Sequence, residues 1–170
     1  MNTDTATQPP PASVHRGDDI CVSTWNINSI KAHLSVLTNY LDARRPDIVM
    51  LQETKTENAG FPFFELNAMG YDAVAVGQKS YNGAAILAKG KIELTLDKLP
   101  NAPDGGDQAR FIETYSPALK SRFISVYVPN GQPSATDSES TERLEYKLAW
   151  LDALTDYARD LTNRDDAFVI

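Results

Sequence analysis

The chain has 170 residues, 42% apolar and 23% charged, a length and composition that suit one hydrophobic core. No stretch approaches 18 consecutive apolar residues, which excludes a membrane-spanning helix. The net charge of −7 argues against a nucleic-acid partner, because proteins that bind nucleic acids usually carry excess positive charge. The argument is weak, because a site built from metal-binding carboxylates is itself acidic. The single cysteine, Cys21, excludes an internal disulfide and favours a cytoplasmic protein, with this residue as a small buried hydrophobe.

The first 18 residues differ in composition from the rest. They contain a run of three prolines with Thr, Ser and Asp, and they lack the apolar core of a secretory signal. We therefore expect residues 1–18 to be a disordered leader and residues 19–170 to form the folded part.

The predicted elements begin with a strand, a helix and a second strand. The β-rich run 20–28 precedes a helix that starts at Ile30, is capped by Ser29, and has leucines at spacings of three and four. The uninterrupted apolar run 48–51 then indicates a strand covered on both faces. The length of this unit is typical of a right-handed crossover that joins two neighbouring parallel strands.

The middle of the chain is rich in predicted strands. A short helix closed by Gly70 precedes two strands, 71–77 and 84–90, that we expect to pair across the polar connection QKSYNG. Further strands are expected at 92–96, 109–116 and 122–127.

One long helix and a last strand are predicted for the carboxyl-terminal part. Leucines from Leu144 to Leu161 mark one face of a helix over 138–161, and we interpret this face as core packing. The apolar run 167–170 indicates a new buried strand, at which the sequence stops. By analogy with 48–51 we expect functional residues to follow it, so that the chain is an incomplete domain.

Three of the apolar strands end in polar residues of the kind that bind metal ions or phosphate. The first ends at Asn26, the second at Glu53 and the third at Tyr127. Mg²⁺ prefers oxygen ligands and keeps several waters, so that one or two carboxylates and an amide oxygen suffice. Because the crossover makes the strands of Asn26 and Glu53 neighbours, these residues are candidates for a metal site. No Cys/His spacing for zinc is present.

Each of these residues also has a purely structural interpretation. Glu53 would be a surface carboxylate paired with Lys55, and Asn26 would be a strand-capping amide. Tyr127 would be a strand tyrosine whose hydroxyl satisfies a buried partner.

Six segments occur in an order and at distances that resemble a known family. They are WNINSIKA, PDIVMLQETK, GQKSYNGAAIL, QARFIE, YVPNG and RLEYKLAWLDAL. Over about residues 19–170 the chain resembles the amino-terminal part of the exonuclease III branch of the endonuclease/exonuclease/phosphatase superfamily. The segment LQETK occurs in several branches of this superfamily. The combination of GQKSYNG with YVPNG and YKLAWL points more specifically to the exonuclease III branch. The resemblance implies the α/β class, a four-layer α/β/β/α sandwich of two mixed sheets, present here as its carboxyl-truncated first half.

The resemblance also implies an activity. It predicts a monomeric DNA repair nuclease that hydrolyses double-stranded DNA at abasic sites and 3′ ends with Mg²⁺, or Mn²⁺ in its place. Glu53 would be the principal metal ligand, Asn26 a direct or indirect oxygen partner, and Tyr127 a contact to the scissile phosphate. The positions expected to face DNA are Arg110, Asn130, Lys79, Tyr81 and Asn82.

The chain departs from this family where it stops. The family continues past the position of Ile170 with Gly-Asp-x-Asn, whose Asp activates the water, and later with a further metal-site Asp and Ser-Asp-His. None of these lies in the 170 residues, so we expect this chain alone to be inactive. A phosphatase of the same superfamily that acts on small phosphoesters and a non-catalytic fragment stay open as alternatives.

Overall fold

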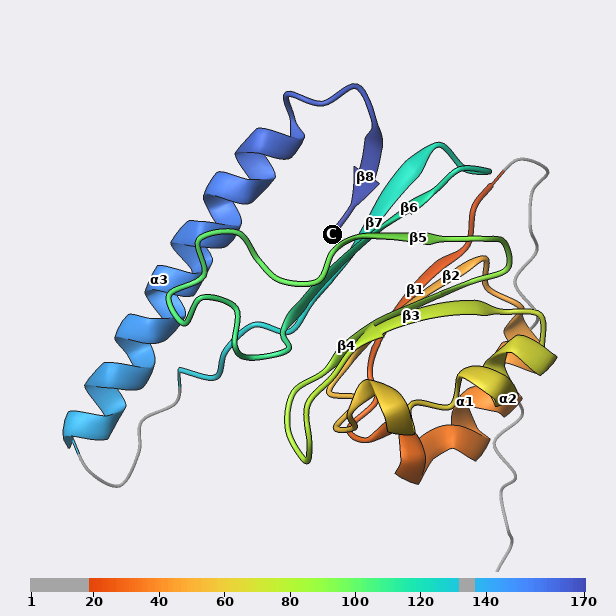
Figure 1. The fold of residues 1–170 in the computed structure, drawn as a ribbon, viewed down its shortest axis with the longest axis horizontal. Helices are drawn as coiled ribbons and strands as arrows, with labels where there is room; N and C mark the ends of the chain where they lie inside the picture. Colours follow the sequence, from red (N-terminus) through yellow and green to blue (C-terminus); the bar gives the residue numbers. More distant parts are fainter. Residues whose placement is uncertain (1–18, 132–136) are drawn as a thin grey trace, which may run out of the picture.

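The computed structural model describes residues 19–131 and 137–170, and these form four layers, helix, sheet, sheet and helix (Figure 1). One sheet has the strand order β1-β2-β4-β3 and the other β5-β6-β7-β8. The strands are β1 (Val22–Asn26), β2 (Ile48–Gln52), β3 (Asp72–Val76), β4 (Ala84–Ala88), β5 (Glu93–Leu96), β6 (Phe111–Ser116), β7 (Ser121–Val126) and β8 (Ala167–Val169). The helical segments are α1 (Ile30–Arg44), the 3₁₀ turn η1 (Asn58–Gly60), α2 (Phe63–Ala68) and α3 (Asp137–Leu161). Among the described residues, no helix combines the length and apolar character needed to span a bilayer.

The first sheet confirms the predicted strand, helix, strand unit. β1 and β2 are parallel neighbours connected through α1. The Ser29 hydroxyl accepts from the Ala32 backbone N–H at 3.4 Å and caps the start of α1, while Arg45 ends it in the left-handed conformation. β3 and β4 pair antiparallel, also as predicted.

β2 is buried on both faces, which accounts for its continuous apolar run. Val49 and Leu51 pack against α1 and α2, whereas Ile48 and Met50 face the second sheet. Hydrophobic layers on both sides of the strand hold its carboxyl end rigidly in place, and that end leads to Glu53.

α3 covers the outer face of the second sheet, and the predicted leucine face takes part only toward its carboxyl end, where Leu161 is buried and Leu151 and Leu154 are partly buried (Figure 1). Leu144 and Leu148 are 47% and 52% exposed. The α3 side chains buried against β6 and β7 are Trp150, Ala153, Tyr157 and Leu161. These also recur at helical spacing, and the aromatic rings bury more area than a leucine, so the helix is rotated toward them.

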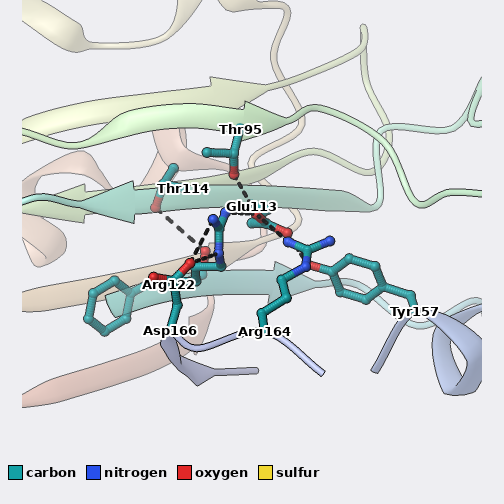
Figure 2. A network of polar contacts seen from close by, with 8 residues as sticks. Thr95, Glu113, Thr114, Arg122, Tyr157, Arg164 and Asp166 are labelled. Atoms are coloured by element: carbon teal, nitrogen blue, oxygen red, sulfur yellow. Dashed lines mark hydrogen bonds and ion pairs between the residues drawn. The ribbon is translucent and has the colours of Figure 1, made fainter. Parts of the chain in front are cut away.

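A buried polar network joins α3 to β6 and β7 (Figure 2). The Glu113 carboxylate accepts from Thr95 Oγ1 and from Arg122 Nη1, each at 2.6 Å. It also accepts from the Tyr157 hydroxyl. Arg122 Nε donates to Asp166 Oδ2 at 2.8 Å, which ties the segment before β8 to β7. The buried carboxylate is therefore paired and hydrogen-bonded, as a charge in an interior must be.

Two predictions about burial were wrong. β8 is an exposed strand, because among the described residues it has only β7 as a neighbour, and Val169 is 37% exposed. Cys21 is half-buried, since it precedes β1 at the edge of the first sheet. The predicted leader, residues 1–18, lies outside the described residues.

Candidate functional site

The carboxyl ends of β1, β2 and β7 lie at one edge of the two sheets. Asn26 is the last residue of β1, and Glu53 and Tyr127 directly follow β2 and β7. On β7 the side chains of Phe123 and Ser125 face the first sheet, where the Ser125 hydroxyl donates to a β2 carbonyl. Alternation along the strand turns Tyr127 the same way, toward Glu53. The structure thus brings together the three residues predicted from strand ends.

Glu53 is the centre of this group. Asn26 Nδ2 donates to Glu53 Oε1 at 2.7 Å, Lys55 Nζ pairs with Oε2 at 3.0 Å, and the Tyr127 hydroxyl lies near enough to the carboxylate to lower its pKa. The bond from Asn26 lowers the pKa of Glu53 most and outweighs the opposing effect of burial. Lys55 and Tyr127 lower this pKa further, so Glu53 is ionised. Glu53 therefore makes the ion pair with Lys55 that a surface carboxylate would make, and it also makes the contact with Asn26 that a metal site would need.

The backbone that carries Glu53 is strained. Glu53 and Lys55 have φ of 54° and 52°, in the left-handed region that non-glycine residues rarely adopt. Neighbouring loops hold this conformation, since the Ser29 N–H donates to the Glu53 carbonyl at 2.7 Å and the Lys55 N–H to the Asn82 carbonyl at 2.9 Å. Strain of this kind persists where surrounding structure fixes it, often at functional sites.

Gly83 lets the QKSYNG connection approach the backbone after β2. Its φ is +94°, and a Cβ at this position would lie 2.1 Å from Thr54 Oγ1. Asn82 beside it is buried, and its Nδ2 donates to Gln78 Oε1 at 3.1 Å. A side chain at Gly83 would therefore displace the turn that holds Glu53.

Arg110 completes the group from the second sheet. Its guanidinium lies 4.7 Å from the centre of the Tyr127 ring, and its Nε donates to Gln108 Oε1 at 2.7 Å. Burial raises the pKa of Tyr127, and the nearby Glu53 carboxylate raises it further, while Arg110 opposes this. Tyr127 therefore keeps its proton and is a hydrogen-bond donor in this site.

An open cleft of about 640 Å³ lies beside Tyr127. The predicted residues that line it are Tyr81, Asn82, Arg110, Tyr127 and Asn130. Lys79 is exposed and does not line the cleft. The lining residues that sequence reasoning missed are Gln108, Pro129, Glu142, Arg143 and Tyr146. Four of these, Gln108, Pro129, Arg143 and Tyr146, lie within the segments QARFIE, YVPNG and RLEYKLAWLDAL that resemble the family, although the helix of Tyr146 is interpreted from the sequence only as core packing.

The donor set at this edge suits a hard cation only in part. In residues 19–131 and 137–170, no three His, Cys, Asp or Glu side chains form a group that could hold a metal ion. Mg²⁺ can be bound by one or two carboxylates together with substrate phosphates and waters, and Glu53 fits that role because its oxygens retain free lone pairs. Asn26 turns its amide N–H toward Glu53, so in this arrangement it orients the carboxylate.

Comparison with known proteins identifies the class. Residues 23–170 match the Endonuclease/Exonuclease/phosphatase family, and because this match spans most of the chain, the chain belongs to that family.

Among solved structures, the chain is similar to a 3′ phosphatase from Neisseria bound to a product DNA hairpin. The TM-score is 0.74 with 34% identity, over 86% of this chain and 54% of that one. An AP endonuclease from Archaeoglobus fulgidus gives a TM-score of 0.73 with 32% identity, over 84% and 52% of the two chains. These similarities confirm the predicted α/β fold of two mixed sheets.

Among curated proteins, exodeoxyribonuclease III of Haemophilus influenzae is 27% identical over 121 residues. The aligned part is 68% of this chain and 44% of that protein. The chain therefore spans about half the length of the relatives that it matches.

Proposed function

We propose that this chain supplies the Glu53 half of the active site of a Mg²⁺-dependent DNA repair nuclease that hydrolyses phosphodiesters at abasic sites and 3′ ends. The observation that carries the proposal is the contact of Glu53 with Asn26 and Tyr127 where β1, β2 and β7 end. The relatives named as an exodeoxyribonuclease III, an AP endonuclease and a DNA-bound 3′ phosphatase support this substrate class.

Glu53 would hold the metal ion, Mg²⁺ or Mn²⁺. When bound, the ion would supply positive charge to the phosphate and to the leaving oxygen. Asn26 fixes the orientation of the carboxylate through its 2.7 Å hydrogen bond. The lowered pKa keeps Glu53 ionised, and therefore able to act as a ligand, at neutral pH.

Tyr127 and Arg110 would bind the scissile phosphate. The raised pKa of Tyr127 keeps its hydroxyl protonated, so that it can donate to a phosphate oxygen. Arg110 brings a positive charge to the same side of the cleft, where developing negative charge is stabilised by fixed donors. Tyr81, Asn82 and Asn130 would meet the DNA backbone along the cleft.

We expect the 170-residue chain alone to be inactive. The described residues form no cluster of three metal-ligating side chains, so Glu53 would bind the ion weakly without further carboxylates. The activity is therefore proposed for a site in which further carboxylates stand beside Glu53, and it is tested in the product of the complete reading frame.

The test is incision of an abasic-site duplex by the product of the complete reading frame, with Mg²⁺, with EDTA, and after Mg²⁺ is restored. Glu53→Gln should lower the rate about a thousandfold or more, because it removes a charged metal ligand. The matched control is Glu57→Gln, which changes an exposed carboxylate close in sequence and should leave the rate unchanged. Incision that is insensitive to EDTA, or a Glu53→Gln variant of normal rate, would refute the assignment.

The DNA-bound relative named as a 3′ phosphatase favours a second candidate, removal of a 3′ phosphate from DNA. The same assay with a duplex that ends in a 3′ phosphate compares this reaction with incision. A soluble inositol phosphate serves as the third substrate. If phosphate is released from the inositol phosphate and neither DNA substrate reacts, the protein is a phosphatase of small phosphoesters.

A further inference from the structure

The connection between β5 and β6 meets α3 next to Arg110. Asp104 lies in this connection and Tyr146 lies on α3, and the Tyr146 hydroxyl donates to Asp104 Oδ2 at 3.0 Å. Tyr146 and Arg110 line the same cleft. A helix that packs on the outer face of the second sheet thus also lines the cleft at the edge of that sheet.

Asp104 shapes the connection that leads to Arg110. Its carboxylate accepts from the backbone N–H of Gly106 at 3.1 Å and of Gln108 at 3.0 Å. Gln108 Oε1 in turn accepts from Arg110 Nε at 2.7 Å. Asp104 therefore fixes the backbone of Gln108, and with it the place from which Gln108 Oε1 accepts the Arg110 hydrogen bond.

Tyr146 also lies near Arg110. Burial, followed by the bond to Asp104, raises the pKa of the Tyr146 hydroxyl to about 12, and the charge of the nearby Arg110 opposes this. A hydroxyl that gives its proton to Asp104 still has lone pairs for a guanidinium donor. Arg110 is thus tied to Asp104 through Gln108, and it lines the same cleft as the Tyr146 side chain that holds Asp104.

We propose that Tyr146 and Asp104 are positioning residues that hold Arg110 against Tyr127 in the orientation that meets the phosphate. The inference rests on the proposed function, since it concerns a phosphate bound in this cleft. The Tyr127 ring packs on the guanidinium at 4.7 Å, and Gln108 holds its Nε edge, while Tyr146 acts on this arrangement through Asp104. A planar guanidinium binds phosphate well only when its donors point the right way, so the supporting contacts set its effectiveness.

The first test is Tyr146→Phe in the product of the complete reading frame, which removes one hydroxyl and keeps the ring. We expect kcat for incision to fall about tenfold, the size of effect that loss of a supporting contact has. KM should change less than about twofold, because Arg110 still lines the cleft but meets the reacting phosphate less well. Asp104→Asn should reproduce the loss. The matched control is Tyr40→Phe, whose hydroxyl bonds Ser23 at the first sheet and whose kcat should be normal.

A double-mutant cycle separates positioning from general structural damage. In an Arg110→Ala background, Tyr146→Phe should cause no further loss of kcat, because the residue through which it acts is gone. A loss in that background as large as in the wild type would overturn the proposal.

A readout without catalysis distinguishes failure of this inference from failure of the proposed function. The Arg110 Nε–H resonance, identified by its absence in Arg110→Ala, should shift in Tyr146→Phe and stay in place in Tyr40→Phe. If the wild type does not incise DNA, the proposed function fails, and this resonance still decides whether Tyr146 holds Arg110. A resonance unmoved in Tyr146→Phe, or an active enzyme with normal kcat in that variant, refutes the positioning role.

Discussion

Glu53 and Glu113 are both glutamates with a tyrosine hydroxyl beside the carboxylate, and the pKa of each is held below its ordinary value. Glu113 lies within β6, covered by α3, and is fully buried. Glu53 lies just past the end of β2, on a strained backbone beside a cleft. For Glu113 burial is the largest influence and raises the pKa, but the bonds from Thr95, Tyr157 and Arg122 together outweigh it.

The difference teaches what each carboxylate contributes. The donors described around Glu113 belong to the protein and the side chain is closed to solvent, so its charge is engaged within the fold and is not available to a ligand. Glu53 keeps an accessible side, and its donors fix its direction while leaving lone pairs for a ligand. Changes at Glu113 should therefore affect stability, and changes at Glu53 should affect function.

The largest effect on stability should come from Glu113→Gln. It removes the buried carboxylate of Glu113 and leaves the half-buried Arg122 paired with Asp166 alone, and loss of one member of a buried ion pair typically costs about 3 to 5 kcal/mol. Glu53→Gln should cost less than about 1 kcal/mol, because that side chain lies at an edge. Urea unfolding of the two variants measures both values, and equal losses would remove the distinction between the two carboxylates.

The two tyrosines offer the next comparison. Tyr157→Phe removes a donor to a buried charge and should lower the free energy of unfolding by about 1.5 to 3 kcal/mol. Tyr127→Phe should change it by less than about 0.5 kcal/mol, yet lower the incision rate of the complete product about a hundredfold. A Tyr127→Phe variant that is unstable but active would reverse the proposed assignment of the two regions.

Acid sensitivity follows from the lowered pKa of Glu113. The unfolded chain binds this proton near the ordinary value of 4.5, while the folded chain binds it only at lower pH. The contribution of Glu113 is therefore fully present above that pH and is lost as the pH falls through the folded pKa. Thermal unfolding measured at a series of pH values below 4.5 should show a steeper fall in the melting temperature for the wild type than for Glu113→Gln. Glu53→Gln should flatten the decline less.

The sequence was sufficient to predict those parts of the site that depend on local signals. Asn26, Glu53 and Tyr127 are polar residues at the ends of apolar runs, and the crossover made two of the strands neighbours. Tyr146 gave no such signal, because its segment predicts a helix but not what the helix touches. Its contact with Asp104 depends on how α3 lies across a sheet that is distant in sequence.

The rotation of α3 shows the same limit for the fold. The helix and its bounds follow from periodicity, yet two apolar faces compete, one through Leu144 and Leu148 and one through Trp150 and Tyr157. Hydrophobic spacing fits both faces. The face that packs on the sheet is the one whose Tyr157 also donates to the buried carboxylate of Glu113, a bond that a leucine does not provide.

The smallest predicted effect has the opposite sign and concerns Thr54, next to Glu53. Thr54 is buried, and within residues 19–131 and 137–170 its Oγ1 finds no hydrogen-bond partner. Valine has nearly the same shape without the hydroxyl, so Thr54→Val should raise the free energy of unfolding by about 1 kcal/mol. Urea unfolding measures the change, with Thr56→Val, which loses a hydroxyl that donates to the Glu57 carbonyl, as the control expected to destabilise.

A gain from Thr54→Val would mean that the turn carrying Glu53 is not optimised for stability, in contrast to the satisfied network around Glu113. A loss would mean that the hydroxyl has a partner such as an ordered water, and that polar contacts behind Glu53 are as complete as those in the core. The sign of the change in the free energy of unfolding therefore separates two cases. Either Glu53 and Glu113 differ only in their exposure to solvent, or the polar groups around them also differ in how completely they are hydrogen-bonded.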